Sequence, residues 1–252
     1  MLYNYHTHTA RCNHANGTDR EYVEKAIEAG YKTLGISDHA PYLFKKDGYY
    51  SVFRMQVDEL QSYAESVRSL AKEYAADIRI LLGFELEYYP ALHKDEMAFL
   101  KSVNPDYCIM GQHMLGNEFD DPFAGRSTDP AKLTHYVSQV LEGLATGDFT
   151  YLAHPDLPGY KFPEEHYLKE YRRLCEGAKA LNIPLEINLL GIRTGRQYPS
   201  RVLFEMAAEI GNDIIIGVDA HDPLQFLDKS PNEKAAEMVK DLGLKLIEKP
   251  LL

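Results

Sequence analysis

Short apolar runs alternate with longer amphipathic segments along the whole of this 252-residue chain. A continuous apolar run of about four to eight residues is typical of a buried strand, and apolar positions spaced three and four apart predict a helix with one buried face. The predicted strands are residues 2–9, 33–37, 78–84, 107–110, 149–153, 184–187, 214–218 and 244–247, and the first of these ranges includes the turn that follows its strand. The predicted helices are residues 18–30, 54–76, 91–102, 131–145, 164–181, 200–211 and 233–242.

Turn and capping residues support these boundaries. Thr18 and Glu21 have the spacing of a capping box, and Gly30 follows the helix as a C-terminal stop signal. The Gly- and Pro-containing segment 116–130 is predicted to be a polar loop that serves as a lid, and 191–197 a loop after a strand end.

Strict alternation of strands and helices predicts a parallel sheet. With this many units, closure into a barrel resembling a TIM barrel is favoured over an open sheet. The chain shows no internal repeat and no long linker, so we expect one domain over residues 1–252. In such a barrel, catalytic groups lie at the carboxyl ends of the strands.

Seven of the ten histidines fall at, or just after, the end of a predicted strand: His6, His8, His14, His39, His113, His154 and His221. In an extended chain, side chains two apart point to one side, so His6 and His8 can offer two imidazoles to the same ion. Glu85 and Asp219 also stand at strand ends. The other three histidines, His93, His135 and His166, lie on predicted helices and are expected to be surface or packing residues.

This cluster predicts a site for several metal ions. Imidazoles and carboxylates without thiolates suit Zn²⁺, Mn²⁺ or Fe²⁺. Nine candidate ligands are too many for one ion and would serve three, with Glu85 able to bridge two of them. Closely spaced ions generate hydroxide from water and clamp phosphoryl oxygens, so the set predicts hydrolysis of a phosphate ester, with amide hydrolysis as the other natural use.

Composition and charge argue against a nucleic-acid-binding, membrane-spanning or secreted protein. The formal net charge of −11 argues against a broad nucleic-acid surface, which needs clustered Lys and Arg. No apolar run approaches the length of a membrane span, and the N-terminus does not resemble a signal peptide. Cys12, Cys108 and Cys175 are scattered, which predicts reduced thiols in a cytoplasmic protein, with a ligand role for Cys12 left open.

The chain resembles the PHP (polymerase and histidinol phosphatase) family, and within it the stand-alone histidinol-phosphatase branch. The resemblance is carried by His6-Thr7-His8, His14, Ser37-Asp38-His39, Gly83-Phe84-Glu85, Gly111-Gln112-His113, Ala153-His154-Pro155 and Asp219-Ala220-His221-Asp222-Pro223. Leu185-Glu186-Ile187-Asn188, Gly191-Ile192-Arg193 and Tyr198-Pro199-Ser200 are similar to the branch. Residues 116–128 match nothing that we can place.

The resemblance implies a distorted (β/α)₇ barrel with three divalent ions. The first ion would take His6, His8, Glu85 and Asp219; the second Glu85, His113 and His154; the third His14, His39 and His221. It also implies L-histidinol phosphate as the substrate and histidine biosynthesis as the pathway.

Several polar residues near the strand ends are candidates for supporting roles. Arg193 and Arg126 are predicted to grip phosphate oxygens, against the alternative of surface arginines. Glu186 and Asn188, two apart at a strand end, are predicted to meet the substrate or to form a structural polar pair. The carboxylate of Asp38 would orient a ligand imidazole or cap the next segment.

Glu87 shares a face with Glu85. It is predicted to be a neighbour that buries little, with a supporting role near the metals as the alternative. Asp219 and His221 are also the candidates, beside metal-held water, for protonating the leaving alkoxide.

The sequence thus predicts a metal-dependent phosphomonoesterase in which hydroxide held between ions attacks phosphorus. Its partner would be a small phosphate ester, with no membrane, with nucleic acid disfavoured, and with a homo-oligomer left open. Two alternatives remain: a PHP phosphoesterase acting on phosphotyrosine, nucleotide or sugar phosphates, and a non-catalytic metal-binding regulatory module.

Overall fold

Seven parallel strands form the centre of the computed structural model, which describes residues 2–44, 49–118, 123–159, 163–247 and 251–252. They are β1 (Tyr3–Asn4), β2 (Thr33–Ile36), β3 (Arg79–Leu86), β4 (Tyr107–Met110), β5 (Leu185–Asn188), β6 (Asp213–Gly217) and β7 (Lys245–Leu246). One sheet has the order β1-β2-β3-β4 and the other β5-β6-β7.

Isolated parallel bridges join the two sheets in two places, between β4 and β5 and between the segments that follow β1 and β6. Leu152 pairs with Met110 at the end of β4 and with Leu185 at the start of β5, while Thr7 pairs with Ala220 after β6. The strands therefore follow one another around a curled sheet whose carboxyl ends all lie at the same side. This arrangement confirms the predicted distorted TIM-like barrel. The terminal strand β7 pairs only with the first residues of β6, away from the carboxyl ends.

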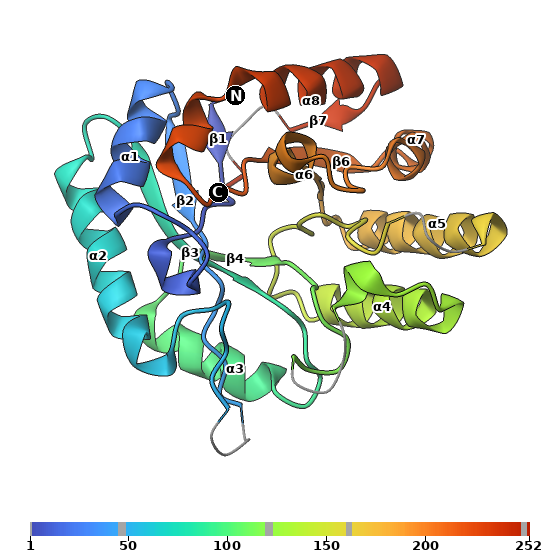
Figure 1. Ribbon diagram of the computed structural model, residues 1–252, viewed down its shortest axis with the longest axis horizontal. Coiled ribbons are helices and arrows are strands. Elements are labelled where there is room, and N and C mark those ends of the chain that lie inside the picture. Colours follow the sequence, from blue (N-terminus) through green and yellow to red (C-terminus); the bar gives the residue numbers. More distant parts are fainter. Residues whose placement is uncertain (1, 45–48, 119–122, 160–162, 248–250) are drawn as a thin grey trace.

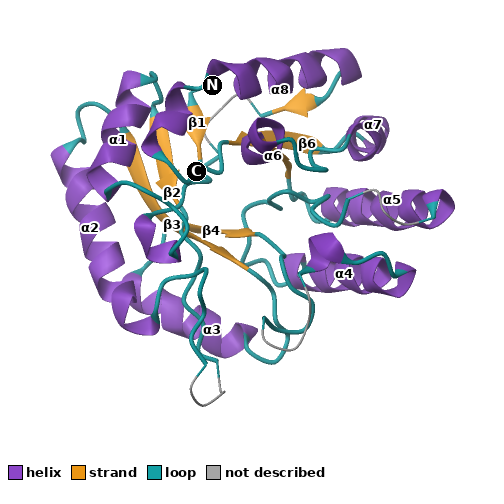
Figure 2. Ribbon diagram, in the orientation of Figure 1, coloured by secondary structure: helices purple, strands orange, loops and turns teal. Residues whose placement is uncertain are grey.

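Helices cover the outside of the strands, with α1 to α3 on one side and α4, α5, α7 and α8 on the other (Figures 1 and 2). They are α1 (Asp19–Glu28), α2 (Leu60–Glu73), α3 (His93–Leu100), α4 (Pro130–Leu144), α5 (Glu164–Ala180), α6 (Leu189–Thr194), α7 (Arg201–Ile210) and α8 (Lys229–Leu242). Short 3₁₀ helices are η1 (Ala10–Cys12), η2 (Val57–Glu59), η3 (Lys101–Val103), η4 (Ala124–Arg126) and η5 (Pro223–Leu227). Among the described residues, none of the helices has the length and apolar character that a bilayer span requires.

The predicted helix boundaries follow local chemistry where it is strong. Thr18 and Glu21 form the capping box at the start of α1. In α2, the buried positions repeat at helical spacing, as expected of a helix packed on a sheet: Leu60, Tyr63, Ala64, Val67 and Leu70. This helix begins at Leu60 and not at Arg54, because residues 51–56 are irregular and η2 precedes the helix.

Two predicted elements are wrong in form. Residues 149–153 lie in the expected place, and residues 150–153 hydrogen-bond through the backbone to the segments on both sides, but they form isolated bridges at Leu152 and not a regular strand. Residues 191–197 are not wholly a loop, because Leu189–Thr194 forms the short helix α6, which Asn188 caps and Gly195 ends at φ 64°.

Tyr107 fills the interior of the barrel below the site. Its hydroxyl donates to the carbonyl of Tyr5 at 2.7 Å. A Cβ atom at Gly35 would lie 2.1 Å from the Tyr107 hydroxyl oxygen, and one at Gly83 would lie 2.3 Å from its ring. The two glycines therefore leave the space that this ring needs, and the barrel is a packed core with the site above it.

Candidate metal centre

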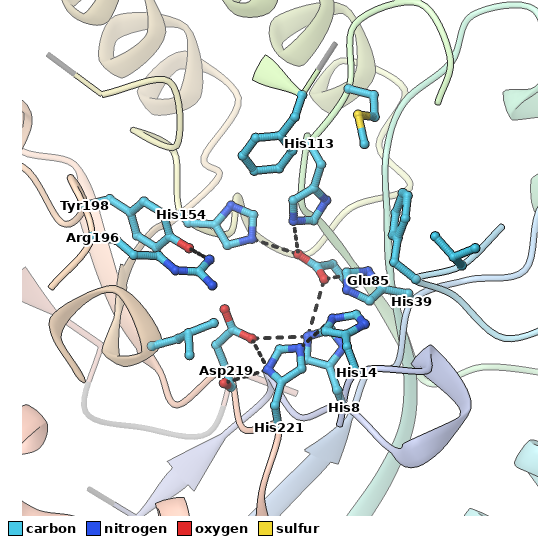
Figure 3. Close-up of a pocket in the computed structure, with 15 residues that line it drawn as sticks. His8, His14, His39, Glu85, His113, His154, Arg196, Tyr198, Asp219 and His221 are labelled. Carbon is cyan, nitrogen blue, oxygen red and sulfur yellow. Dashed lines mark hydrogen bonds and ion pairs between the residues drawn. The ribbon is translucent and has the colours of Figure 1, made fainter. Parts of the chain in front are cut away.

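The carboxyl ends of the strands bring all nine predicted ligands into one cluster. Figure 3 labels all of them except His6. His6 and His8 follow β1, His39 follows β2, Glu85 lies near the end of β3, and His113 follows β4. His154 follows the bridge at Leu152, Asp219 and His221 follow β6, and His14 comes after η1. His93, His135 and His166 lie on α3, α4 and α5, as predicted.

Glu85 is at the centre of the cluster. Its Oε1 lies 2.9 Å from His154 Nε2, 3.5 Å from His6 Nε2 and 3.8 Å from His113 Nε2. Its Oε2 lies 3.1 Å from His39 Nδ1 and 3.4 Å from His8 Nε2. A carboxylate with imidazoles at both oxygens has the arrangement of a bridging ligand.

Asp219 is the second carboxylate of the cluster. Its Oδ1 lies 3.2 Å from His8 Nε2, 3.3 Å from His221 Nδ1 and 3.6 Å from His6 Nε2. His221 Nε2 in turn faces His14 Nε2 at 3.0 Å. The nine side chains are therefore linked continuously across the cavity.

Two ligand residues have backbones in the left-handed region. The φ angle is 49° at Asp219 and 29° at His154. Residues with a Cβ rarely adopt such angles, which cost on the order of 1–3 kcal/mol and concentrate at functional sites. Here the strained backbone turns both side chains into the cluster.

Several buried donor and acceptor atoms of the cluster lack a hydrogen-bond partner: His6 Nε2, His8 Nε2, His39 Nδ1, Glu85 Oε2 and Asp219 Oδ1. An unpaired buried polar atom costs roughly 1–3 kcal/mol, so such atoms are rare in folded proteins. Triads of these ligands have atoms within 4.8 Å of one another, among them His6-His8-Glu85, His8-His39-His221 and His6-His154-Asp219. Cys12 lies within the same distance of His14 and His221. The donor set and its unpaired atoms therefore fit divalent metal ions.

Electrostatics keeps the two carboxylates ionised. Burial alone would raise the pKa of Glu85, but the surrounding imidazoles, His39 and His6 first, hold it well below its ordinary value. Burial would also raise the pKa of Asp219, but His6 and His8 hold it well below its usual range. Both groups are thus in the form that binds a cation.

Glu186 and Asn188 lie beneath the ligands. Glu186 Oε1 is 2.8 Å from His6 Nδ1, and its Oε2 accepts from the His154 backbone N–H at 3.1 Å. The Asn188 amide donates to Glu186 at 2.9 Å and to Asp219 Oδ2 at 3.0 Å. Both residues are fully buried and do not line the cavity, so we expect them to orient ligands and not to touch the substrate.

Two further carboxylates support the ligand rings. Asp38 accepts from the His39 backbone N–H at 2.8 Å, and its Oδ1 lies 3.5 Å from Nδ1 of His8. It therefore faces the ring of His8 and not that of the adjacent His39. Glu87 accepts from His113 Nδ1 at 3.0 Å. The prediction that Glu87 buries little is wrong, because its carboxylate is wholly enclosed.

The cluster forms the floor of a cavity of about 460 Å³. Apolar side chains line its walls: Val52, Phe53, Met114, Phe123 and Leu190. Arg196 and Tyr198 also line it, with Arg196 donating to the Tyr198 hydroxyl at 2.7 Å (Figure 3). Among the described lining residues, Arg196 thus places a guanidinium beside a floor whose donors could hold metal ions. Phe123 comes from the loop predicted to be a lid, of which residues 119–122 lie outside the described part, and Met114 comes from the segment just before that loop.

The structure places the two predicted arginines differently. Arg193 points away from the cavity, with Nε 3.4 Å from Asp228 Oδ2 at the start of α8. The backbone of Arg126 lies in η4, and its side chain is outside the description. Sequence reasoning missed Arg196, although it lies in the same Gly- and Arg-containing segment that drew attention to Arg193.

Comparison with known proteins shows the family of this chain. The sequence pattern of the PHP domain matches residues 4–189. The chain belongs to the PHP domain family. Asp219 and His221 lie beyond the matched residues, yet the fold brings them into the same centre.

Relatives of this PHP protein carry phosphatase names. A probable histidinol-phosphatase of Deinococcus radiodurans is 31% identical over 252 residues, which cover 94% of this chain and 92% of the relative. The histidinol-phosphatase of Bacillus subtilis is 30% identical over 115 residues, 44% of this chain and 43% of its own. This PHP protein is a phosphatase, and its ligand cluster is that of a metal-dependent one.

A solved structure shares the fold. The histidinol phosphate phosphatase of Lactococcus lactis, in complex with zinc, L-histidinol and phosphate, superposes with a TM-score of 0.74 at 19% identity. The match covers 98% of this chain and 95% of that one. The common architecture therefore extends over nearly the whole length of both proteins.

Proposed function

We propose that this PHP protein hydrolyses L-histidinol phosphate to L-histidinol and inorganic phosphate, as a step of histidine biosynthesis. The observation that carries the proposal is the cluster of unpaired imidazole and carboxylate atoms on the floor of a cavity with apolar walls. The name of the Deinococcus radiodurans relative, which matches over nearly the full length of both chains, supports this substrate. The zinc, L-histidinol and phosphate bound by the Lactococcus lactis protein support it as well.

We assign three divalent ions of zinc, manganese or iron to the nine ligands. The sets are His6, His8, Glu85 and Asp219 for the first ion, Glu85, His113 and His154 for the second, and His14, His39 and His221 for the third. When bound, such ions supply a hydroxide nucleophile at neutral pH and neutralise charge on the phosphoryl oxygens. The protein's part is to hold these donors at fixed places relative to the substrate.

Arg196 is the side chain that we assign to the phosphoryl group. Its guanidinium lines the cavity, and the Tyr198 hydroxyl holds it there. A planar guanidinium can donate two hydrogen bonds to phosphate oxygens, and these bonds strengthen as negative charge develops on the oxygens. The aromatic walls at Phe53 and Phe123 offer a surface for the flat imidazole of the leaving alcohol. Asp219 is held as a carboxylate, and burial lowers the pKa of His221 to about 3, so neither predicted group is protonated at neutral pH to supply a proton to the leaving oxygen.

A cytoplasmic location follows from the same role. Cys12, Cys108 and Cys175 are free and buried, which suits a reducing compartment.

The test is kcat/KM for phosphate release from L-histidinol phosphate, with protein reloaded with Mn²⁺ or Zn²⁺. A panel of phosphotyrosine, nucleotide and sugar phosphates serves as comparison. We expect a preference of about a hundredfold or more for L-histidinol phosphate, which corresponds to roughly 2.7 kcal/mol of differential transition-state binding.

Equal, slow rates on every ester would reject L-histidinol phosphate as the preferred substrate but would still agree with phosphatase activity. Metal uptake without turnover of any ester would favour a binding module.

A further inference from the structure

Arg54 is a buried arginine outside the ligand set that contacts several ligand-bearing segments. Its exposed fraction is 1%, although it lies in the irregular segment before α2 and not in the barrel. Its guanidinium packs over the rings of Tyr42 and Phe53, with its central carbon 4.8 Å and 4.7 Å from their centroids. Phe53 in turn lines the cavity and meets the ring of His39 edge-on. Arg54 therefore lies directly behind one wall of the site.

The guanidinium of Arg54 binds three acceptors on different segments. NH2 donates to Glu87 Oε2 at 3.0 Å, and Nε donates to Glu118 Oε2 at 2.8 Å. NH1 donates to the carbonyl of Ala40 at 3.0 Å. The side chain thus joins the segments that follow β2, β3 and β4.

Two of these acceptors are close to a metal ligand. Ala40 is the residue after His39, so the Arg54 bond fixes the backbone beside that imidazole. Glu87 uses its other oxygen to accept from His113 Nδ1, which leaves Nε2 of that ring directed at Glu85. A ring fixed in this way presents one defined nitrogen to a metal ion.

The backbone of Arg54 reaches a fourth segment. Its carbonyl accepts from the amide of Asn13 at 3.2 Å, and Asn13 is the neighbour of His14. Among the described residues, none of the contacts found for Arg54 reaches the β1 segment with His6 and His8 or the β6 segment with Asp219. Its contacts therefore favour one side of the metal cluster.

We propose that Arg54 is a positioning residue that holds the ligands His14, His39 and His113 in place, and with them the second and third ions. The guanidinium suits this role because its rigid fork reaches three acceptors in one plane. A lysine ammonium keeps the charge but is a point donor on a flexible stem. The inference rests on the proposed metal sites and is independent of which ester is hydrolysed.

The test is the metal content of full-length Arg54→Lys protein, measured by mass spectrometry after dialysis against increasing concentrations of a chelator. We expect the variant to keep one tightly held ion and to lose the others at chelator concentrations about 10- to 100-fold lower than wild type does, as is usual when a group that orients ligands is removed. Excess Mn²⁺ should restore kcat toward the wild-type value, with the metal concentration for half-maximal activity raised by a similar factor.

Two further variants make the result specific. Arg68→Lys is the matched control, because Arg68 also forks between a carboxylate and a carbonyl, Asp106 Oδ2 at 2.7 Å and Asn104 O at 2.6 Å, near the opposite end of β4. It should retain metal as wild type does. If Arg54→Lys does not fold, the double variant Arg54→Met with Glu118→Gln carries the measurement, because it removes one positive and one negative charge together.

Retention of every ion at wild-type chelator concentrations would overturn the inference, as would equal loss of all ions. Since metal content is read without substrate, a wild-type protein that binds metal but ignores L-histidinol phosphate overturns the substrate alone. A wild-type protein that retains no ion would overturn both the positioning role of Arg54 and the proposed metal-dependent function.

Discussion

At the scale of single residues, the surroundings of a buried carboxyl group decide whether it ionises. Glu85 is enclosed by imidazoles, which keep its pKa well below the ordinary value despite burial. Glu96 on α3 is also buried, with an exposed fraction of 1%. It accepts one backbone hydrogen bond, from Leu43 at 3.2 Å, and its Oε1 has no partner. Burial therefore dominates and raises the pKa of Glu96 to about 8.

This raised pKa makes stability depend on pH. The folded state keeps a proton on Glu96 that the unfolded chain loses near pH 4.5, so the free energy of unfolding falls as pH rises from about 4.5 to about 8. Glu96→Gln keeps an acceptor for Leu43 and cannot ionise. We expect the variant to match wild type at pH 5 and to exceed it at pH 8 by a few kcal/mol, at about 1.4 kcal/mol per pKa unit.

Urea denaturation at several pH values measures this difference. Glu205→Gln, at an exposed position on α7, serves as the control for removing one carboxylate from the protein. A gap between Glu96→Gln and wild type that stays constant from pH 5 to 8 would contradict the pKa assignment.

At the scale of elements, the short helix α6 determines which arginine faces the cavity. Asn188 caps its first turn, and Gly195 ends it in the left-handed conformation. Arg193, inside the helix, lies against Asp228 near α8, and 13% of its side chain is exposed. Arg196, just after the reversal, lines the cavity. Two arginines three residues apart thus have different surroundings.

This difference predicts unequal effects of the same substitution. Arg196→Lys should lower kcat/KM by about 10- to 100-fold, because a charged hydrogen bond contributes roughly 1.5–3 kcal/mol. Arg193→Lys should leave kcat/KM near the wild-type value and change mainly thermal stability. Steady-state kinetics and melting curves of the two variants check this, and the reverse order of effects would show that Arg193 contacts the substrate.

At the scale of the whole molecule, the metal centre joins parts of the chain that are far apart in sequence. Its proposed ligands extend from His6 to His221 and come from β3 and from the segments that follow β1, β2, β4, the bridge at Leu152 and β6. They gather only in the folded state, so ions bind that state and not the unfolded chain. Binding then stabilises the fold by mass action, about 2.7 kcal/mol at a hundred times the dissociation constant.

Metal removal should therefore lower the melting temperature. We expect chelator-treated protein to melt several degrees below the reloaded protein, since about 1 kcal/mol shifts a chain of this size by roughly 2–4 °C. Mn²⁺ or Zn²⁺ should restore the temperature in a concentration-dependent way. Ca²⁺ should have little effect, because it prefers oxygen ligands and most of these are imidazoles. Identical melting with and without Zn²⁺ or Mn²⁺ would argue against a metal centre.

The sequence by itself determined the architecture and the set of candidate ligands. Alternation of apolar runs with amphipathic helices requires parallel strands, and parallel strands place their carboxyl ends together. Histidines and carboxylates at those ends, such as His39 and Glu85, could therefore be gathered into one site without coordinates. These signals are local in the chain, which is why they are readable from it.

Only the tertiary structure decided what each supporting side chain faces. The two-residue spacing puts Glu186 and Asn188 on one face of a strand, but their depth below the ligands depends on how the barrel closes. The choice between Arg193 and Arg196 depends on where a six-residue helix ends. Arg54 gives no periodic or motif signal, because its acceptors come from three other segments of the chain. Such contacts follow from packing between distant segments, and no local pattern encodes them.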